Sequence, residues 1–254
     1  MTHPTLLFGA ALAALSAGIY FYVGRVLSRR RQSSAEAATA WRMFVMWWYA
    51  LAGATLSGSL LNLLGAFGIE DLALFTTFTI LNLLVTCAAL FGLIFYLLYL
   101  YTGLNHLFGP LAAFYFFYYA LLIYYVQVRI PNDVNLDRWT VALEFENPIP
   151  GPLFLVALLF LFVPQLIGSL AYFMLYFQVR EPTQKYRILL VSWSIFIWFM
   201  SGLLAGIAGL AQYDWWQIVS RLIGLGAALI ILFAYRPPSW IKRRFGIAAI
   251  AEGG

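Results

Sequence analysis

The chain contains 254 residues, of which 63% are hydrophobic and 10% are charged, and its mean hydropathy is +0.85. Soluble domains have about 45–50% apolar and about 25% charged residues, so a soluble fold of this composition would expose large apolar patches and aggregate. The composition excludes a soluble globular protein and predicts a polytopic membrane protein. The single cysteine, Cys87, excludes an intrachain disulfide and the paired thiols of a structural zinc site.

Seven stretches are long and apolar enough for a helix to cross the hydrocarbon core of a bilayer, which takes about 20 residues. The predicted fold is an all-α integral membrane protein, with a bundle of seven transmembrane helices over residues 1–236 and a short basic tail over 237–254. The first stretch has no basic residues before its apolar run, so we expect it to stay attached rather than be cleaved as a signal. The predicted spans are 5–27, 42–66, 72–101, 107–128, 153–178, 187–211 and 215–235.

The charged residues between the spans predict the orientation, because Lys and Arg close to span ends are retained on the cytoplasmic side. We expect the N-terminus outside, the C-terminus in the cytoplasm, and a multi-pass protein of the inner (plasma) membrane. The acidic residues then lie mostly outside, at Glu70, Asp71, Asp133, Asp137, Glu144, Glu146 and Asp214. The cytoplasmic side holds 12 of the 15 basic residues, namely Arg25, Arg29, Arg30, Arg31, Arg42, Arg180, Lys185, Arg187, Arg236, Lys242, Arg243 and Arg244.

The longest loop, residues 127–151, joins the fourth and fifth spans on the expected exterior side. Within it, Trp139, Val141, Leu143 and Phe145 alternate with polar or small residues, which is the two-residue period of a half-buried strand. Such a strand could lie across the mouth of the bundle as a lid. The alternative is a solvated connector.

Arg221 is the one charged residue well inside a predicted span rather than at its end, and a charge at the centre of a span costs roughly 2.5–3.5 kcal/mol. It follows Asp214, the predicted N-cap of the seventh helix, by seven residues, which places it roughly 10 Å below the outer helix end. The side chain could reach the interface, Gln217 or Asp214, which would be a structural role. Alternatively, it faces the bundle interior and binds an anionic headgroup or carboxylate, which suits its planar donors.

Amides and aromatic rings inside the spans are further candidates for contacts with a ligand. Most polar groups in spans form interhelical hydrogen bonds, but carboxamides are costly to bury because both donors and acceptors need partners. Clustered aromatic rings could line a pocket for a lipid, quinone or isoprenoid, or they could fill the core and face lipid. The expected ligand-binding residues are Arg221, Gln165, Asn82, Trp193, Trp198 and Tyr172.

Two features are expected to shape the helices. Pro164 should kink the fifth span beside Gln165 and free a carbonyl group there. Gly202 and Gly206 form a GxxxG pattern that predicts a packing seam on the sixth span.

The residue types present in the spans also argue against catalysis and active transport. The spans contain no His, Asp or Glu, so we expect no metal site, no bis-His haem, no Ser-His triad and no carboxylate relay for ion pumping. We expect no enzyme activity and no nucleic-acid partner. The short loops and tail leave no room for a soluble output domain, so a protein partner in the membrane or cytoplasm is expected. The basic loops either fix the topology or also attract anionic lipid.

The layout of seven helices, an exterior N-terminus, a strand-bearing loop between helices four and five and a short basic tail resembles heptahelical receptors. These include microbial rhodopsins and the seven-helix input modules of bacterial sensor kinases. A retinal protein of that type carries its chromophore on a lysine of the seventh helix. Here that helix has Arg221, and the chain's lysines, Lys185 and Lys242, lie in cytoplasmic segments, so covalent retinal is not expected.

The resemblance and the residues together predict a receptor-like membrane sensor. It would bind an apolar or anionic amphiphilic ligand within the bundle and signal through a partner. Two alternatives stay open: a structural or assembly subunit of a larger membrane complex, and a small-solute carrier.

Overall fold

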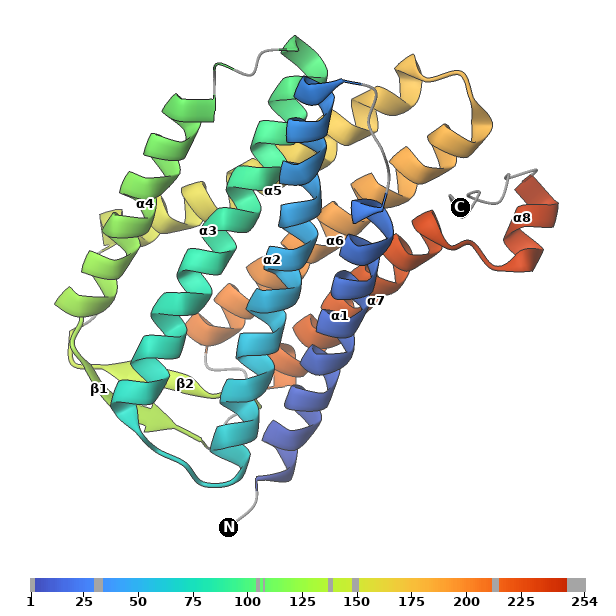
Figure 1. Cartoon of the computed structure of the whole chain (residues 1–254). Helices are drawn as coiled ribbons and strands as arrows, with labels where there is room; N and C mark the ends of the chain where they lie inside the picture. The colour runs from blue at the N-terminus through green and yellow to red at the C-terminus, as the bar shows by residue number, and fades with distance from the viewer. Residues whose placement is uncertain are drawn as a thin grey trace.

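The computed structural model in Figure 1 is a long helical bundle with a small β-hairpin at one end. It describes residues 3–29, 34–103, 106, 108–136, 139–147, 151–211 and 215–245, without the side chains of 125, 151–162, 164–165, 205–211 and 244–245. The elements are α1 (Pro4–Ser28), α2 (Ala35–Ala66), α3 (Leu72–Thr102), α4 (Phe108–Val128), β1 (Pro131–Asn135), β2 (Ala142–Phe145), α5 (Gly151–Gln178), α6 (Pro182–Ala211), α7 (Trp215–Tyr235) and α8 (Ser239–Phe245).

The long helices form a ring around a shared interior. Successive contacts run from α1 to α2, α3, α5, α6 and α7, and α7 returns to contact α1. Helix α4 packs against α3 and touches α5, and it lies at the edge of the bundle (Figure 1). We call the two ends of the bundle the hairpin end and the α8 end.

Six helices are long and apolar enough to cross a membrane, which supports the prediction of a multi-pass membrane protein. They are α1, α2, α3, α4, the Pro182–Leu204 part of α6, and α7. The remaining predicted span, 153–178, coincides with α5, whose apolar segment with described side chains is Leu166–Gln178. Large hydrophobic side chains cover the outside of the bundle, for example Phe117 and Phe177 at 72% and 70% exposure. Lipid, rather than water, is the solvent that suits such a surface.

Two helices begin well before the predicted spans at 42 and 187. Helix α2 starts after Ser34, whose hydroxyl accepts a hydrogen bond from the Ala37 N–H at 3.1 Å. Helix α6 starts after Glu181, whose carboxylate accepts hydrogen bonds from the N–H groups of Thr183 and Gln184. Hydrogen bonding, chiefly from the Thr183 side chain, lowers the pKa of Glu181. Hydropathy marks the apolar part of a helix, whereas these caps decide where the helix starts.

The strand predicted in the loop between α4 and α5 is confirmed as β2, and it has a partner that the sequence pattern did not reveal. Strand β2 pairs antiparallel with β1, and Val134 lies opposite Leu143. The β1 sequence shows no alternation, so its strand depends on pairing with β2. Gly65 of α2 lets the hairpin approach closely, because a Cβ there would lie 2.6 Å from a methyl carbon of Val141.

The interior differs between the two halves of the ring. The α8 half is filled by a hydrophobic core in which Phe44, Trp47 and Trp48 are almost fully buried, together with Tyr20 and Ile231. At the hairpin end, a smaller cluster of Leu6, Ala66, Phe75, Val134 and Leu136 holds the hairpin against the helix ends. The space between these two clusters holds the candidate site.

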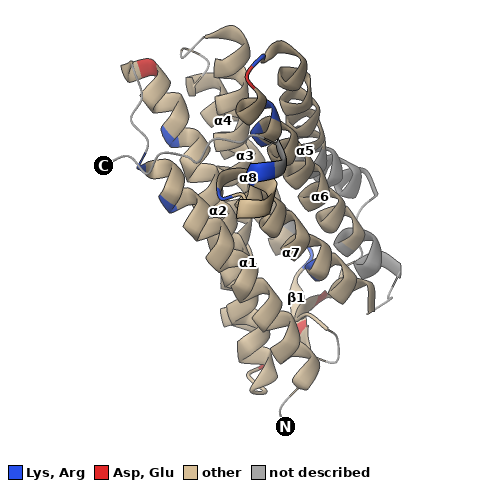
Figure 2. Cartoon of the chain, turned by 90° about the vertical axis from the view of Figure 1, so that its right-hand side faces the viewer, with Lys and Arg blue, Asp and Glu red and all other residues tan. Residues whose placement is uncertain are grey.

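Most charged residues lie toward the two ends of the bundle, and the basic residues, blue in Figure 2, are concentrated at the α8 end. Arg25, Arg236 and Arg243 lie at the α8 end, whereas Asp133 and Glu144 lie on the hairpin. The short helix α8 within the predicted basic tail was not expected. It begins directly after Pro237 and Pro238, which end α7 because proline cannot continue the hydrogen-bond ladder.

Candidate functional site

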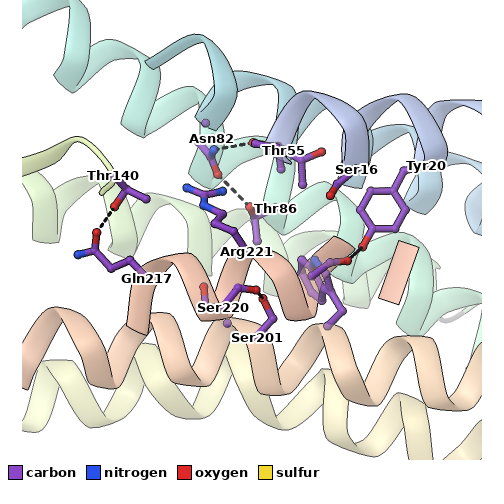
Figure 3. Close-up of a pocket in the computed structure, with 16 residues that line it drawn as sticks. Ser16, Tyr20, Thr55, Asn82, Thr86, Thr140, Ser201, Gln217, Ser220 and Arg221 are labelled. Atoms are coloured by element: carbon purple, nitrogen blue, oxygen red, sulfur yellow. Dashed lines mark hydrogen bonds between the residues drawn. The ribbon is translucent and has the colours of Figure 1, made fainter. Parts of the chain in front are cut away.

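A cavity of about 400 Å³ lies inside the hairpin half of the ring. Its volume is within the range of about 300–1,000 Å³ that is usual for small-molecule sites. The lining comes from α1, α2, α3, α6 and α7, with Thr140 of the hairpin loop at the mouth. Figure 3 labels its polar residues: Ser16, Tyr20, Thr55, Asn82, Thr86, Thr140, Ser201, Gln217, Ser220 and Arg221.

One face of α7 supplies the most polar wall of the cavity. Gln217, Ser220, Arg221 and Gly224 all line it, and their spacing of i, i+3, i+4 and i+7 places them on one stripe of a helix. The Arg221 side chain faces the bundle interior, as the functional prediction requires (Figure 3). Asp214 lies outside the described residues, and anion binding stays a prediction.

The Arg221 guanidinium group reaches across the cavity to α2. Its two terminal nitrogens lie 3.6 and 3.8 Å from where a Cβ of Gly58 would stand, so the group rests on a bare stretch of backbone. Within the described part of the chain, Arg221 makes no hydrogen bond or ion pair, and none of the lining residues carries a carboxylate. The cavity thus contains a cation whose donors have no protein acceptor in this part of the structure.

Most of the hydroxyl groups around the cavity donate their hydrogens to the protein. Ser16, Thr55 and Ser201 donate to backbone carbonyls at 2.8–3.0 Å. Tyr20 donates to the Gly224 carbonyl at 3.3 Å, and Thr86 donates to the Asn82 side-chain oxygen at 3.3 Å. These hydroxyl groups therefore offer a ligand mainly their lone pairs.

The donors left for a ligand are concentrated on α7. The Gln217 carboxamide oxygen accepts a hydrogen bond from Thr140 at 2.8 Å, which leaves its NH₂ group for the cavity. The Ser220 hydroxyl donates no hydrogen bond to the described part of the chain, and the Arg221 guanidinium adds five N–H donors. A cation surrounded by donors is suited to an anion with several acceptor oxygens.

Asn82, a predicted ligand contact, lines the cavity but serves mainly to join helices. Its NH₂ group donates to the Ala54 carbonyl at 3.0 Å and to the Ser57 hydroxyl at 2.6 Å, both on α2. Its carbonyl oxygen accepts from Thr86. Because both donors are used, Asn82 positions the cavity wall and is a weaker anchor for an anion than the α7 residues.

The two ends of the cavity are closed in different ways. At the mouth, Thr140 bonds to Gln217, and the Val141 N–H donates to the side-chain oxygen of Asn62 at 3.0 Å. At the floor, Tyr20 and Trp198 line the cavity above the packed core of the α8 half. The mouth is held by a few hydrogen bonds from a loop, whereas the floor is held by interlocked aromatic rings.

The other predicted site residues are scattered. Trp198 and Gly202 line the cavity, whereas Trp193 is 49% exposed and Tyr172 is buried beside Phe44 in the core of the α8 half. Neither Trp193 nor Tyr172 lines the cavity. The side chains of Pro164, Gln165 and Gly206, and all of Asp214, lie outside the described residues, so the kink, the seam and the cap stay predictions.

Sequence reasoning missed several residues that shape the site. Gly58 and Tyr20 carry no signal that separates them from other small or aromatic residues in the spans. Ser220 does carry such a signal, because it lies beside Arg221 and one helical turn after Gln217. The polar stripe at helical spacing could have been found by testing the seventh span for periodicity of its polar residues.

Comparison with known proteins assigns this chain to no family. Neither the protein-family models nor the curated proteins compared with this chain produced a match. Among the described residues, no group of three or more His, Cys, Asp or Glu is close enough to hold a metal ion.

Proposed function

We propose that the protein is a receptor-like membrane sensor that binds an anionic amphiphile in the cavity and signals through a partner protein. The observation that carries this proposal is Arg221, which is aimed into the cavity without a protein acceptor among the described residues. An unpaired charge in a membrane-spanning helix is costly, and such residues mark functional sites. A carboxylate, phosphate or sulfonate group would supply the missing counter-charge.

The lining also suggests how an amphiphile would lie. Its anionic group would bind Arg221, Gln217 and Ser220, and its apolar part would lie toward Tyr20 and Trp198 at the floor. The hairpin loop would act as a lid, because Thr140 and Asn62 join it to the mouth by single hydrogen bonds. With the orientation that the charges predict, this mouth opens to the exterior of the cell.

A closed floor favours a sensor over a carrier. A carrier needs a route to both sides of the membrane, and the core of the α8 half fills that route with Phe44, Trp47 and Trp48. Occupation of the cavity would instead change the packing of α1, α6 and α7 around it. A partner could read this change at the α8 end, where the helices end in basic residues.

Anion binding can be tested with laurate, a twelve-carbon carboxylate, and dodecanol, its uncharged analogue, on the full chain in lipid nanodiscs. We expect laurate to raise the melting temperature of the protein more than dodecanol does. Replacing Arg221→Gln should weaken laurate binding about 10- to 100-fold, which corresponds to the loss of one charge-assisted hydrogen-bonded pair. The matched control is Arg243→Gln on α8, which removes the same charge outside the cavity.

A second variant tests the cavity without removing the charge. Gly58→Leu would place a side chain where the guanidinium now rests and should reduce laurate binding, whereas Gly58→Ala adds a Cβ at ordinary contact distance and should be tolerated. Equal laurate binding by the wild type, Arg221→Gln and Gly58→Leu would contradict the proposal.

The second candidate function is an assembly subunit, and the exposed aromatic face of α4 favours it. Phe116, Phe117 and Tyr124 are 68%, 72% and 61% exposed, and α4 contacts little of the bundle besides α3. Native mass spectrometry of the gently purified protein separates the two functions. A bound anionic amphiphile that is lost in Arg221→Gln would support the sensor, whereas a fixed set of subunits without such a ligand would support assembly.

A further inference from the structure

A second hollow lies on the outside of the bundle, between α1 and α7. It has a volume of about 510 Å³ and is lined by Ala14, Leu15, Gly18, Ile19, Tyr22, Leu232 and Arg236. Gly18 forms part of its floor, and a Cβ added there would have nothing within 4 Å. Tyr20, between Gly18 and Tyr22 in the chain, points the other way into the internal cavity. The groove is therefore distinct from the candidate site of the proposed function.

The groove has an apolar length and one cationic end. The lining from Ala14 to Tyr22 covers about 12 Å at the rise of an α-helix, close to the roughly 15 Å depth of one leaflet of the hydrocarbon core. Arg236, directly after the end of α7, lies with its guanidinium carbon 5.3 Å from the centre of the Tyr22 ring. The dimensions and the charge at one end match an acyl chain with an anionic headgroup.

A second arginine lies beyond the same end of the groove. Arg25 is three residues after Tyr22 and seven after Gly18, so it lies on the same face of α1, and its side chain is exposed. None of the described groove residues is acidic. Two guanidinium groups near the headgroup level provide a site for a phosphodiester, which guanidinium groups bind well.

We propose that this groove binds an anionic phospholipid from the leaflet at the α8 end, with one acyl chain between α1 and α7 and the phosphate at Arg236 and Arg25. The lipid would cover the seam between the first and last helices of the ring. This seam also carries the hydrogen bond from Tyr20 to Gly224 beside the internal cavity. The groove lipid would thus stabilise the closure of the ring, whichever ligand the internal cavity takes.

Native mass spectrometry of the full chain with equal amounts of dioleoyl phosphatidylglycerol and dioleoyl phosphatidylcholine tests the headgroup. We expect the wild type to retain the anionic lipid preferentially. Arg236→Gln should reduce that preference about fivefold, the effect of one basic residue at an anionic lipid surface. Arg243→Gln on α8 is the control, because it has the same charge and lies outside the groove. An equal loss in both variants would overturn the site in favour of a diffuse attraction to the basic end.

The acyl part of the site is tested by filling the groove. Gly18→Leu should lower the retention of both lipids about tenfold, because it excludes several methylene groups from the groove. Gly226→Leu on α7 is the matched control, since a Cβ there also meets open space and Gly226 does not line the groove. Equal lipid retention by the two leucine variants, at similar melting temperatures, would overturn the proposal. Laurate binding in the internal cavity should be unchanged in Gly18→Leu, which separates this proposal from that of the sensor.

Discussion

At the scale of single residues, Arg221 departs most from what stability alone would favour. Its charge lies among apolar helices, and its guanidinium rests against Gly58, with no carboxylate of the described residues beside it. The side chain lies about 9 Å from the start of α7, too deep for a short polar residue to reach the interface. The rule that a buried charge needs a partner in the protein is broken mainly at functional sites, where a ligand supplies the missing partner.

This interpretation makes a prediction about stability. Arg221→Met keeps a long side chain but removes the charge, so the ligand-free protein should become more stable, by about 1–3 kcal/mol, because an uncompensated buried charge is removed. Thermal or denaturant unfolding in a fixed detergent measures the change. Laurate should no longer raise the melting temperature of this variant.

The control for this experiment is Arg42→Met, which removes an exposed charge from the other end of the bundle and should change stability by less than about 0.5 kcal/mol. If Arg221→Met instead destabilised the protein by several kcal/mol, Arg221 would have a structural partner and the functional interpretation would be wrong.

At the scale of elements, the hairpin joins the cavity to the outside of the bundle. Val134 of β1 and the adjacent Leu136 pack in one cluster with Leu6 and Phe75, and the loop between the strands contacts α2 and α7. Asn62 is 2% exposed, and its side-chain oxygen accepts the hydrogen bond from the Val141 N–H. Among the described residues the NH₂ group of Asn62 finds no hydrogen-bond partner, so the contact with Val141 is the hydrogen bond that this buried side chain makes there.

Removing this contact should loosen the hairpin without unfolding the helices. Asn62→Ala leaves the Val141 N–H without its acceptor, at a cost of about 1–3 kcal/mol in local stability. Hydrogen exchange measured by mass spectrometry should therefore increase in residues 131–147 and stay the same in α2 and α3. Ser59→Ala, which removes a hydrogen bond from α2 to the Ala10 carbonyl, is the control and should leave exchange in the hairpin unchanged.

Unchanged hairpin exchange in Asn62→Ala would mean that apolar packing alone holds the hairpin. In that case a lid controlled by hydrogen bonds would have to be abandoned.

At the scale of the whole molecule, the ends of the bundle differ in charge, and this difference predicts which side is exterior. Cysteine labelling tests the orientation in a Cys87→Ala background, since Cys87 is buried and free. In intact cells, a membrane-impermeant maleimide should label Glu144→Cys on β2 and should not label Arg243→Cys on α8. Both positions are exposed in the structure, so the comparison is matched for access.

The opposite labelling pattern would reverse the orientation, and the cavity would then open to the cytoplasm. Labelling of both positions from outside would contradict an odd number of membrane crossings between β2 and α8.

The predictions from sequence succeeded where the bilayer itself imposes a rule. Crossing the hydrocarbon core requires long apolar runs, so each predicted segment falls within or overlaps an observed helix, although α2 and α6 begin several residues earlier. Depth along a helix follows from counting residues, so Arg221 was placed correctly relative to the helix end. The period of two residues in 139–146 identified β2, because alternation reflects a strand with one face against the bundle.

The sequence alone therefore determined that this is a multi-pass helical membrane protein, the approximate course of its helices, the asymmetry of charge and the position of Arg221 along its helix. The tertiary structure decided which side chains meet: Arg221 with Gly58, Asn82 with α2, and Trp198 rather than Trp193 at the cavity. The physical reason is that lipid tails are as apolar as the core. A membrane helix is apolar on every face, so its sequence carries little information about which face turns inward, and that choice is made by packing against its neighbours.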